Sequence, residues 1–275
     1  SIGQTTYEEI TRYFLFRIYL IESDDNLFLN SILSLNPNAL SAAREADFSR
    51  TASEDRDLNP FFGLPILLKD NIGFSGLPTT GGAVALQNNF SDSAFVVSKL
   101  VESGVVILGK ANLSEWAYFF CGDCPSGYSA VGGQTFNPFG RKTLDTGGSS
   151  SGSAVAVAAN FCAAAIGSET SGSILSPASQ NAVVGLKPTV GVISRSGIVP
   201  ISSTLDTAGP ITQYIIDNVL VFNALIGKDS SDFKSKVIPK IDLEALKNPT
   251  YKRKRFGVIR GFLDDSLYNI AVDLI

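Results

Sequence analysis

The sequence contains no histidine in its 275 residues. This absence excludes Ser-His-Asp and Cys-His catalysis, histidine-based metal sites and imidazole acid–base chemistry. A nucleophilic serine in this chain would therefore need a lysine, a carboxylate or a terminal amine as its base. The missing histidine narrows the choice of mechanism more than any single motif does.

Methionine and long apolar runs are also missing. The chain begins at Ser1, has no methionine and shows no signal peptide, so we expect the native start of the protein to lie outside this sequence. No apolar run reaches the ~18 residues of a membrane span, and the compartment stays open. The net charge of −4, without a dense basic patch, predicts no nucleic-acid partner.

Cysteine is scarce. Cys121 and Cys124 form a lone CxxC pattern, and the third cysteine, Cys162, lies in an apolar stretch that we expect to be core. A zinc site needs four ligands, which this set does not supply. The sequence therefore favours a structural or incidental cysteine pair over a metal or redox site, and it predicts no disulfide framework.

The residues that are present indicate an α/β protein. Hydrophobic residues make up 44% of the sequence and charged residues 17%, which is typical of a soluble protein with much buried surface. Periodicity predicts the following elements: a helix at 6–22 with Thr6 and Glu9 as a capping box, a helix from Pro37 with Asn36 as its cap, a polar loop at 49–59, a strand ending near Lys69, an irregular stretch at 73–82, a helix at 93–103 and a strand at 105–108. This alternation predicts a largely parallel sheet covered on both faces.

Further elements are expected in the second half of the chain. The pattern predicts strands at Val183–Ile193 and Gly197–Ile201, a helix at Asp217–Ile226, a polar surface excursion at 228–240, and a strand at Phe256–Ile259 after a charged turn at 252–255.

One stretch, Asp145–Pro177, organises the rest of the chain. Two turns rich in glycine and serine, at 147–153 and 170–173, flank an apolar run of small side chains. The pattern predicts a packed helix at Ala154–Ala159 and a buried strand at Cys162–Ile166. Hydroxyl-rich turns on rigid elements indicate a site, although either turn alone would be interpreted as an ordinary tight connection.

Lys69 is the candidate base. It lies near the end of an apolar stretch, Phe61–Asn71, that would carry its ammonium group into or beside the core. Burial disfavours the charged form of lysine, so such an amine could accept a proton near neutral pH. Taken alone, the same residue would be interpreted as a strand-end lysine that extends to water.

Three motifs favour Lys69 as a catalytic base over Lys69 as a solvent-exposed lysine. Lys69-Asp70-Asn71, the GGSSSGS run at 147–153 and the ETSGSILSP run at 169–177 resemble, in this order, the motifs of the amidase signature family of Ser-Ser-Lys hydrolases. Ser149 and Ser173 stand 24 positions apart, as that family places its bridging and nucleophilic serines. The similarity runs from about residue 60 to 227, and it includes GKANLSEW at 109–116, GLKPT at 185–189 and DTAGP at 206–210. The form GSILSP, with GGQT at 132–135, is most similar to the peptide-amidase-like branch.

The resemblance implies a fold and a set of roles. The fold would be the amidase-signature α/β fold, a mixed and mostly parallel sheet covered by helices on both faces, in a single domain over residues 1–275 whose C-terminal part is missing. Ser173 would be the nucleophile and Ser149, on a cis peptide bond with Gly148, would pass protons between Ser173 and Lys69. Backbone N–H groups of Thr170, Ser171, Gly172 and Ser173 would form the oxyanion hole. No metal or cofactor is implied.

The sequence departs from the common family pattern at a few positions. Glu169 and Ser171 stand where Asp and Gly are usual, Ser151 replaces a glycine, and Leu175 replaces a frequent Arg. Leu175 agrees with the peptide-amidase-like branch, whereas Ser171 lies on the oxyanion turn itself. Two other functions stay open: a catalytically inactive relative kept as a binding or partner protein, and an amidotransferase-type subunit that releases ammonia, which the branch-specific residues disfavour.

The expected partner is a small-molecule or peptide amide with a neutral or apolar acyl group and a small leaving amine, while the oligomeric state stays open. Members of the family are longer than this chain, and the sequence ends inside the apolar-periodic stretch Leu267–Ile275. We therefore expect residues 1–275 to be a fragment that is poorly soluble and inactive when expressed alone.

Overall fold

The structure is a computed structural model that describes residues 5–52, 60–121 and 123–247. It divides into two compact units, residues 1–241 and 242–275. The described part of the second unit contains helix α7 (Leu243–Lys247). The strand predicted at 256–259 and the apolar stretch at 267–275 lie outside the described residues, as does most of the polar loop predicted at 49–59.

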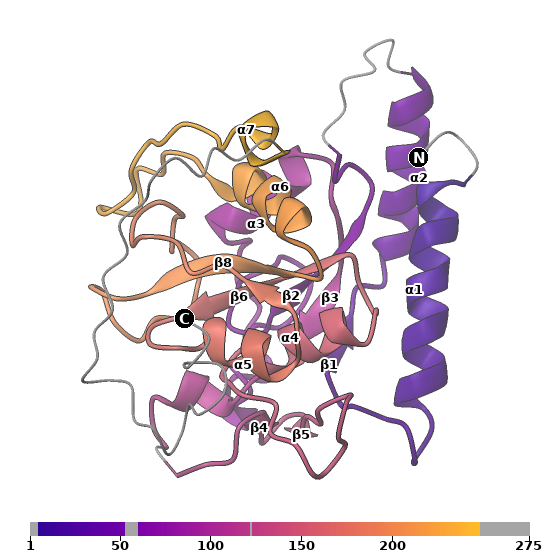
Figure 1. The fold of residues 1–275 in the computed structure, drawn as a ribbon, viewed down its shortest axis with the longest axis vertical. Helices are drawn as coiled ribbons and strands as arrows, with labels where there is room; N and C mark the ends of the chain where they lie inside the picture. The colour runs from indigo at the N-terminus through magenta and orange to yellow at the C-terminus, as the bar shows by residue number, and fades with distance from the viewer. Residues whose placement is uncertain (1–4, 53–59, 122, 248–275) are drawn as a thin grey trace. The chain divides into compact units, whose positions relative to one another are not determined.

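A six-stranded sheet forms the centre of the first unit (Figure 1). Its strands are β1 (Ile32–Leu35), β2 (Pro65–Lys69), β3 (Val106–Ala111), β6 (Ala164–Glu169), β7 (Val184–Gly185) and β8 (Thr207–Thr212), in the order β1-β3-β2-β6-β8-β7. Strand β2 pairs in parallel with β3 and β6, whereas β1, β8 and β7 pair antiparallel with their neighbours. Strands β2, β3, β6 and β7 therefore run one way and β1 and β8 the other, which confirms a mixed, mostly parallel sheet.

Helices cover the sheet on both faces. They are α1 (Tyr7–Glu22), α2 (Ala39–Ala52), α3 (Phe95–Glu102), α4 (Ser151–Ala158), α5 (Leu175–Gln180) and α6 (Ile215–Leu225). Short 3-10 turns occur at η1 (Val84–Leu86) and η2 (Glu115–Tyr118), and β4 (Tyr128–Ser129) pairs with β5 (Gly133–Gln134) in a small hairpin. In Figure 1, α3 and α6 lie on one side of the sheet and α4 on the other.

The alternation of side chains along β2 separates two hydrophobic cores. Leu67 packs into the core shared with α1, α2 and α4, whereas Ile66 and Leu68 pack into the core shared with α3 and α6. All five residues of β2 are buried, as expected for a strand covered on both faces. The period of two directs Lys69 to the same face as Leu67, where α4 begins.

Helix α1 confirms the capping box. The Thr6 hydroxyl accepts a hydrogen bond from Glu9 N, and the Glu9 carboxylate accepts one from Thr6 N. Phe14 and Ile18 are buried, as the periodicity predicts. This arrangement satisfies N–H groups that the first helical turn leaves without partners.

Two strand predictions in the second half are wrong. Of Val183–Ile193, Val184–Gly185 is the part that pairs in the sheet, and Gly197–Ile201 forms a loop whose Ile198 makes an isolated bridge with Ile72. Gly191 has a φ of +88°, and its backbone approaches Lys234 too closely for a side chain. Apolar residues here line turns that pack on the core, and the sequence pattern does not distinguish these from strands.

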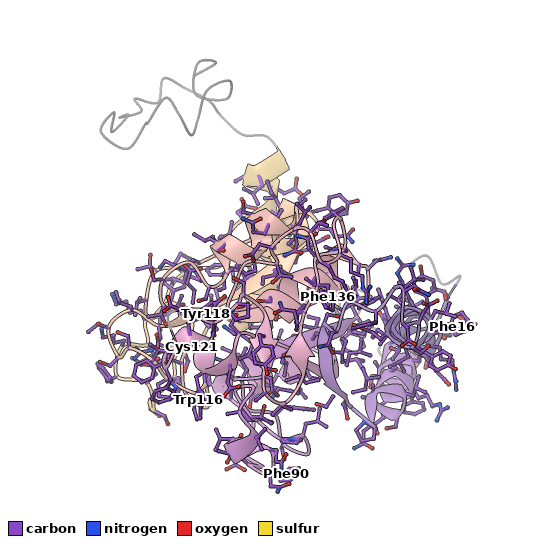
Figure 2. All side chains as sticks on the ribbon, turned by 90° about the horizontal axis from the view of Figure 1, so that it is seen from below. Phe16, Phe90, Trp116, Tyr118, Cys121 and Phe136 are labelled. Carbon is purple, nitrogen blue, oxygen red and sulfur yellow. A yellow bond between two sulfur atoms is a disulfide. The ribbon has the colours of Figure 1, made fainter. Side chains whose placement is uncertain are left out.

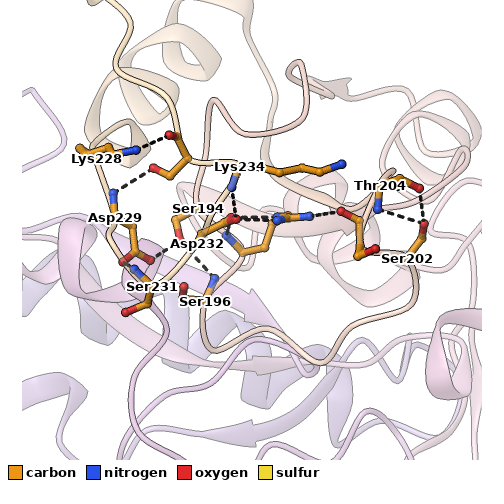
Figure 3. A network of polar contacts seen from close by, with 12 residues as sticks. Ser194, Ser196, Ser202, Thr204, Lys228, Asp229, Ser231, Asp232 and Lys234 are labelled. Atoms are coloured by element: carbon orange, nitrogen blue, oxygen red, sulfur yellow. Dashed lines mark hydrogen bonds and ion pairs between the residues drawn. The ribbon is translucent and has the colours of Figure 1, made fainter.

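The predicted surface excursion at 228–240 is also wrong in part, because buried carboxylates anchor it. Figure 3 shows the polar network that joins this segment to residues 194–204. The Asp229 carboxylate accepts a hydrogen bond from the Ser194 hydroxyl. The Asp232 carboxylate forms an ion pair with Arg195, whose Nε lies 2.8 Å from Asp232 Oδ2.

We expect Asp232→Asn to lower the free energy of unfolding at pH 7 by about 3 kcal/mol, because it leaves the largely buried Arg195 guanidinium without a counter-charge. The hydrogen bond from Arg195 holds the pKa of Asp232 well below its usual range. Since that pKa is depressed in the folded state, this stabilisation is present above the unfolded pKa and is lost as the pH falls into the acid range. Urea unfolding measures the effect. Asp92→Asn, at an exposed carboxylate, is the control and should change stability by less than about 0.5 kcal/mol. Equal stability of the two variants would contradict the prediction.

Candidate active site

Lys69, the last residue of β2, is completely buried. Its Nζ lies 2.7 Å from Ser149 Oγ, 3.0 Å from Ser168 Oγ and 3.2 Å from the Ser168 carbonyl oxygen. The amine therefore does not extend to water. It lies in a polar pocket inside the protein, between the Gly/Ser turn and the end of β6.

Burial lowers the pKa of Lys69 to about 7, because the charged form loses its hydration. The carboxylates of Glu169 and Asp206 act in the opposite direction and are too weak to restore the ordinary value. A lysine with this pKa is substantially neutral at physiological pH and has a lone pair available for a proton.

Ser149 is held by its own backbone and by its neighbours. The Gly148–Ser149 peptide bond is cis, as the resemblance implies. The Ser149 carbonyl accepts a hydrogen bond from Ser114 N at 3.1 Å. A Cβ at Gly148 would lie 2.6 Å from Ser114 Oγ and 2.8 Å from Tyr118 Oη, so a larger residue here would have to displace these two side chains. The hydrogen bond from Ser114 N thus anchors the backbone at Ser149, whose hydroxyl lies 2.7 Å from Lys69 Nζ.

Ser173 lies in the turn between β6 and α5, and it is 6% exposed. Its carbonyl oxygen accepts a hydrogen bond from Ser150 N at 3.0 Å, which ties this turn to the residue that follows Ser149. Its hydroxyl has no hydrogen-bond partner within the described part of the chain. The structure thus brings the two Gly/Ser turns together, as the sequence predicts, and it shows one side-chain link of the expected chain, between Lys69 and Ser149.

The turn at 170–173 presents backbone N–H groups that are not used elsewhere. Among the described residues, the N–H groups of Thr170, Ser171, Gly172 and Ser173 donate no hydrogen bond. Gly172 has a φ of +82°, and a Cβ there would meet no atom within 4 Å. Conformation rather than space therefore requires glycine at this position.

Two carboxylates fix the shape of the same turn. Glu169 Oε2 accepts hydrogen bonds from Ile174 N at 2.7 Å and Leu175 N at 2.9 Å, which are the N–H groups at the start of α5. Asp206 accepts a hydrogen bond from the Thr170 hydroxyl. Glu169, one of the departures from the family pattern, is thus part of the support for the turn.

The sequence reasoning missed Ser168. Its hydroxyl accepts hydrogen bonds from Lys69 Nζ and from Asn71 Nδ2, the second at 2.8 Å. A single serine inside the run AAIGSE carries no signal of its own. Only the parallel pairing of β2 with β6, in which Leu68 lies opposite Ile166, places Ser168 beside Lys69.

A second buried lysine was also missed. Lys110 in β3 forms an ion pair with Asp70 at 3.1 Å, and both side chains are almost fully buried. Asp70 also accepts hydrogen bonds from Thr80, including one from Thr80 N at 3.0 Å. This pair fixes the backbone directly after Lys69, so the Lys-Asp-Asn motif combines a candidate catalytic amine with its structural support.

The CxxC cysteines form a structural pair, one of the two outcomes that the sequence favours. Cys121 and Cys124 form a disulfide, with Cα atoms 5.6 Å apart, which is within the range that a disulfide spans. An odd cysteine count allows one pair and one free thiol. Cys162 is that free thiol; it is buried, and burial raises its pKa to about 12. Within the described residues, no group of three or more Cys, Asp or Glu side chains is placed to hold a metal ion.

None of the helices in the described ranges is both long enough and apolar enough to cross a membrane.

Comparison with known proteins identifies the family. The family model described as Amidase matches residues 9–270. A probable amidase from Arabidopsis thaliana is 42% identical over 94% of this chain and 54% of its own length. A glutamyl-tRNA(Gln) amidotransferase chain from Thermoanaerobacter pseudethanolicus is 38% identical over 94% of this chain and 51% of its own length.

Among solved structures, the native peptide amidase of Stenotrophomonas maltophilia is 45% identical, with a TM-score of 0.82. The match covers 88% of this chain and 49% of that structure. The chain spans about half the length of the relatives it matches. The family match, the mixed sheet and the ordered Lys-Asp-Asn and Gly/Ser motifs agree, and the chain belongs to the amidase family.

Proposed function

We propose that the whole protein hydrolyses carboxamide bonds through an acyl-serine intermediate, with Ser173 as nucleophile, Ser149 as proton relay and Lys69 as base. One observation carries the proposal: a fully buried lysine, with its pKa lowered to about 7, lies 2.7 Å from the Ser149 hydroxyl. A neutral amine has two N–H donors and one lone pair. The two acceptors on Ser168 match the donors, and the Ser149 hydroxyl matches the lone pair.

The chemistry follows from this arrangement. Ser173 Oγ attacks the amide carbonyl carbon while its proton passes through Ser149 to Lys69. The carbonyl oxygen becomes an oxyanion, to which the N–H groups at 170–173 would donate; one such donor typically lowers the barrier by about 3 kcal/mol. The C–N bond then breaks, and the leaving nitrogen takes the proton back from Lys69 through Ser149. Water attacks the acyl-Ser173 ester by the same route and releases the carboxylic acid.

The turn at 170–173 supports a neutral acyl group as the preferred substrate. Leu175, directly after the turn, is 47% exposed and places an apolar side chain where many relatives carry an arginine. The Gly132–Thr135 stretch has a structural role instead. Asn112 Nδ2 donates to the Gly133 carbonyl, and Gln134 Nε2 donates to the Ser126 carbonyl. These contacts fix a loop, so the proposed substrate preference rests on Leu175.

We expect the whole protein to release ammonia from neutral carboxamides, including peptide C-terminal amides, with kcat/KM at least tenfold above that for amides with a charged acyl group. Ammonia release measured over matched neutral, acidic and basic amides tests this. A strong preference for charged acyl groups would contradict the substrate class. Ammonia release from glutamine alone would favour the amidotransferase-type function, and no turnover of any amide would favour an inactive relative.

A further inference from the structure

A small cavity of about 100 Å³ lies beside Asn71. Trp116, Phe119 and Phe120 line one side of it, and residues 199–201, Val-Pro-Ile, line the other. None of the side chains around the cavity is charged, and Asn71 is the amide among them. Such a hollow, apolar with one polar group, is the usual form of a small-molecule subsite.

Asn71 connects the cavity to the candidate catalytic lysine. Its Nδ2 donates to Ser168 Oγ, the same oxygen that accepts from Lys69 Nζ. The cavity is therefore separated from the lysine by one shared hydrogen-bond acceptor. Asn71 Oδ1 is buried and has no partner among the described residues. A buried acceptor without a partner costs free energy, and a donor from a bound molecule would remove that cost.

The chain segment that supplies the aromatic side of the cavity also passes close to Ser149, the second candidate catalytic residue. Trp116, Ala117 and Tyr118 have φ values of 50°, 52° and 70°, a left-handed run that non-glycine residues rarely adopt. The run directs Trp116 toward Gly81, whereas Tyr118 Oη lies against Gly148, next to Ser149. Trp116, Tyr118 and the disulfide-bonded Cys121 are labelled in Figure 2. Conformations of this kind persist where the surrounding structure requires them, and they are often found at binding sites.

The opposite side of the cavity is fixed by hydrogen bonds. Val199 N donates to the Asn71 carbonyl at 2.9 Å, and Ile201 N donates to Asp206 at 2.8 Å. Arg195, held by Asp232, donates to the Ser203 carbonyl at 2.7 Å (Figure 3). The loop is thus held from both ends, which fixes the shape of the cavity. A preformed cavity saves the ordering free energy that binding would otherwise cost.

We propose that this cavity binds the apolar side chain carried by the acyl part of the amide substrate; the proposal rests on the proposed amide hydrolysis at Ser173. In a primary carboxamide the leaving group is ammonia, so any side chain to be recognised belongs to the acyl part. The cavity lining selects an uncharged group of the size of a leucine side chain. Asn71 Oδ1 is the acceptor for an N–H of the same acyl part, which an N-acylated amino-acid amide provides.

Binding to the Ser173→Ala protein tests the cavity without any hydrolysis. We expect N-acetyl-leucinamide to bind at least tenfold more tightly than N-acetyl-glycinamide, as measured by calorimetry, and to change the fluorescence of Trp116, the single tryptophan in these 275 residues. Val199→Phe fills the cavity and should weaken N-acetyl-leucinamide at least tenfold, while N-acetyl-glycinamide changes less than twofold. Val101→Phe is the matched control, because Val101 is exposed on α3 and does not line the cavity.

A second variant covers the case in which Val199→Phe fails to fold. Val199→Ala enlarges the cavity and should shift the preference from N-acetyl-leucinamide toward N-acetyl-phenylalaninamide. Equal binding of the leucine and glycine amides, or an equal loss of both in Val199→Phe, would overturn the proposal. If the unsubstituted protein binds N-acetyl-leucinamide as described but hydrolyses no amide, the cavity assignment stands and the proposed function fails. If it hydrolyses both amides with equal kcat/KM and Val199→Phe changes neither, the function stands and the cavity assignment fails.

Discussion

Replacing Ser173 with alanine should lower kcat for amide hydrolysis in the whole protein by about 10⁴-fold or more, since it removes the proposed nucleophile. Lys69→Ala should cost about as much, because the sequence has no histidine to take the proton instead. Ser149→Ala should cost nearly as much, because Lys69 Nζ makes its 2.7 Å hydrogen bond to that hydroxyl. Steady-state ammonia release under saturating amide measures all three.

Non-additivity is part of this expectation. When residues act as one catalytic unit, the first substitution already removes most of their combined contribution to kcat. The double variant Lys69→Ala, Ser173→Ala should therefore have a kcat only slightly lower than that of either single variant. Ser176→Ala is the matched control, because Ser176 is exposed and lies three residues beyond Ser173. It should keep kcat within about twofold of the unsubstituted value. Near-normal activity of folded Lys69→Ala at mildly alkaline pH would contradict the role of Lys69.

The pH dependence should report the protonation of Lys69. In the proposed mechanism the neutral amine is the active form, and burial lowers the pKa of Lys69 to about 7. Below that value we expect kcat/KM to rise about tenfold per pH unit, and above it to level off, because the free enzyme then carries the neutral amine. An ordinary lysine would place the midpoint near pH 10.4. Rates measured from pH 5 to 9 in buffers of constant ionic strength distinguish the two midpoints.

Lys69→Arg provides the sharpest control for the pH profile. A guanidinium remains charged throughout this range and cannot accept the proton, although it keeps the positive charge and the donors. The variant should be inactive at every pH at which it is folded. A profile with its midpoint well above pH 9, or an active Lys69→Arg protein, would show that a neutral Lys69 is not the base.

The sequence predicts the parts of this site that depend on local pattern. The apolar run before Lys69 indicates a buried strand, and all five residues of β2 are buried. The capping box at Thr6 sets the start of α1. The Gly/Ser density at 147–153 and 170–173 indicates two tight turns near a site. Each of these signals lies within a few neighbouring residues, so it can be read without knowledge of the remaining chain.

Structural features that depend on contacts between residues far apart in the sequence could not be predicted from local patterns. Strand β8 (Thr207–Thr212) is fully buried, but its TAGPIT sequence contains a glycine and a proline, which normally argue against a central strand. Ser168 acquires its place beside Lys69 through the pairing of β2 with β6. From the sequence alone, Asp232 would be assigned to the surface, because it is charged and lies in a polar segment. Its burial depends on the ion pair with Arg195, which is 37 positions away. These three outcomes depend on tertiary pairing rather than on propensity.

The rate at which a fluorophosphonate labels the protein, followed from pH 5 to 9 with mapping of the labelled peptide, tests the central claim most directly. The reagent reacts with an activated serine and needs no knowledge of the natural amide. The account predicts label on Ser173, a rate that rises with pH to a plateau with its midpoint at about 7, and no labelling of Lys69→Arg. Label on another residue, or equal labelling of the unsubstituted and Lys69→Arg proteins, would contradict it.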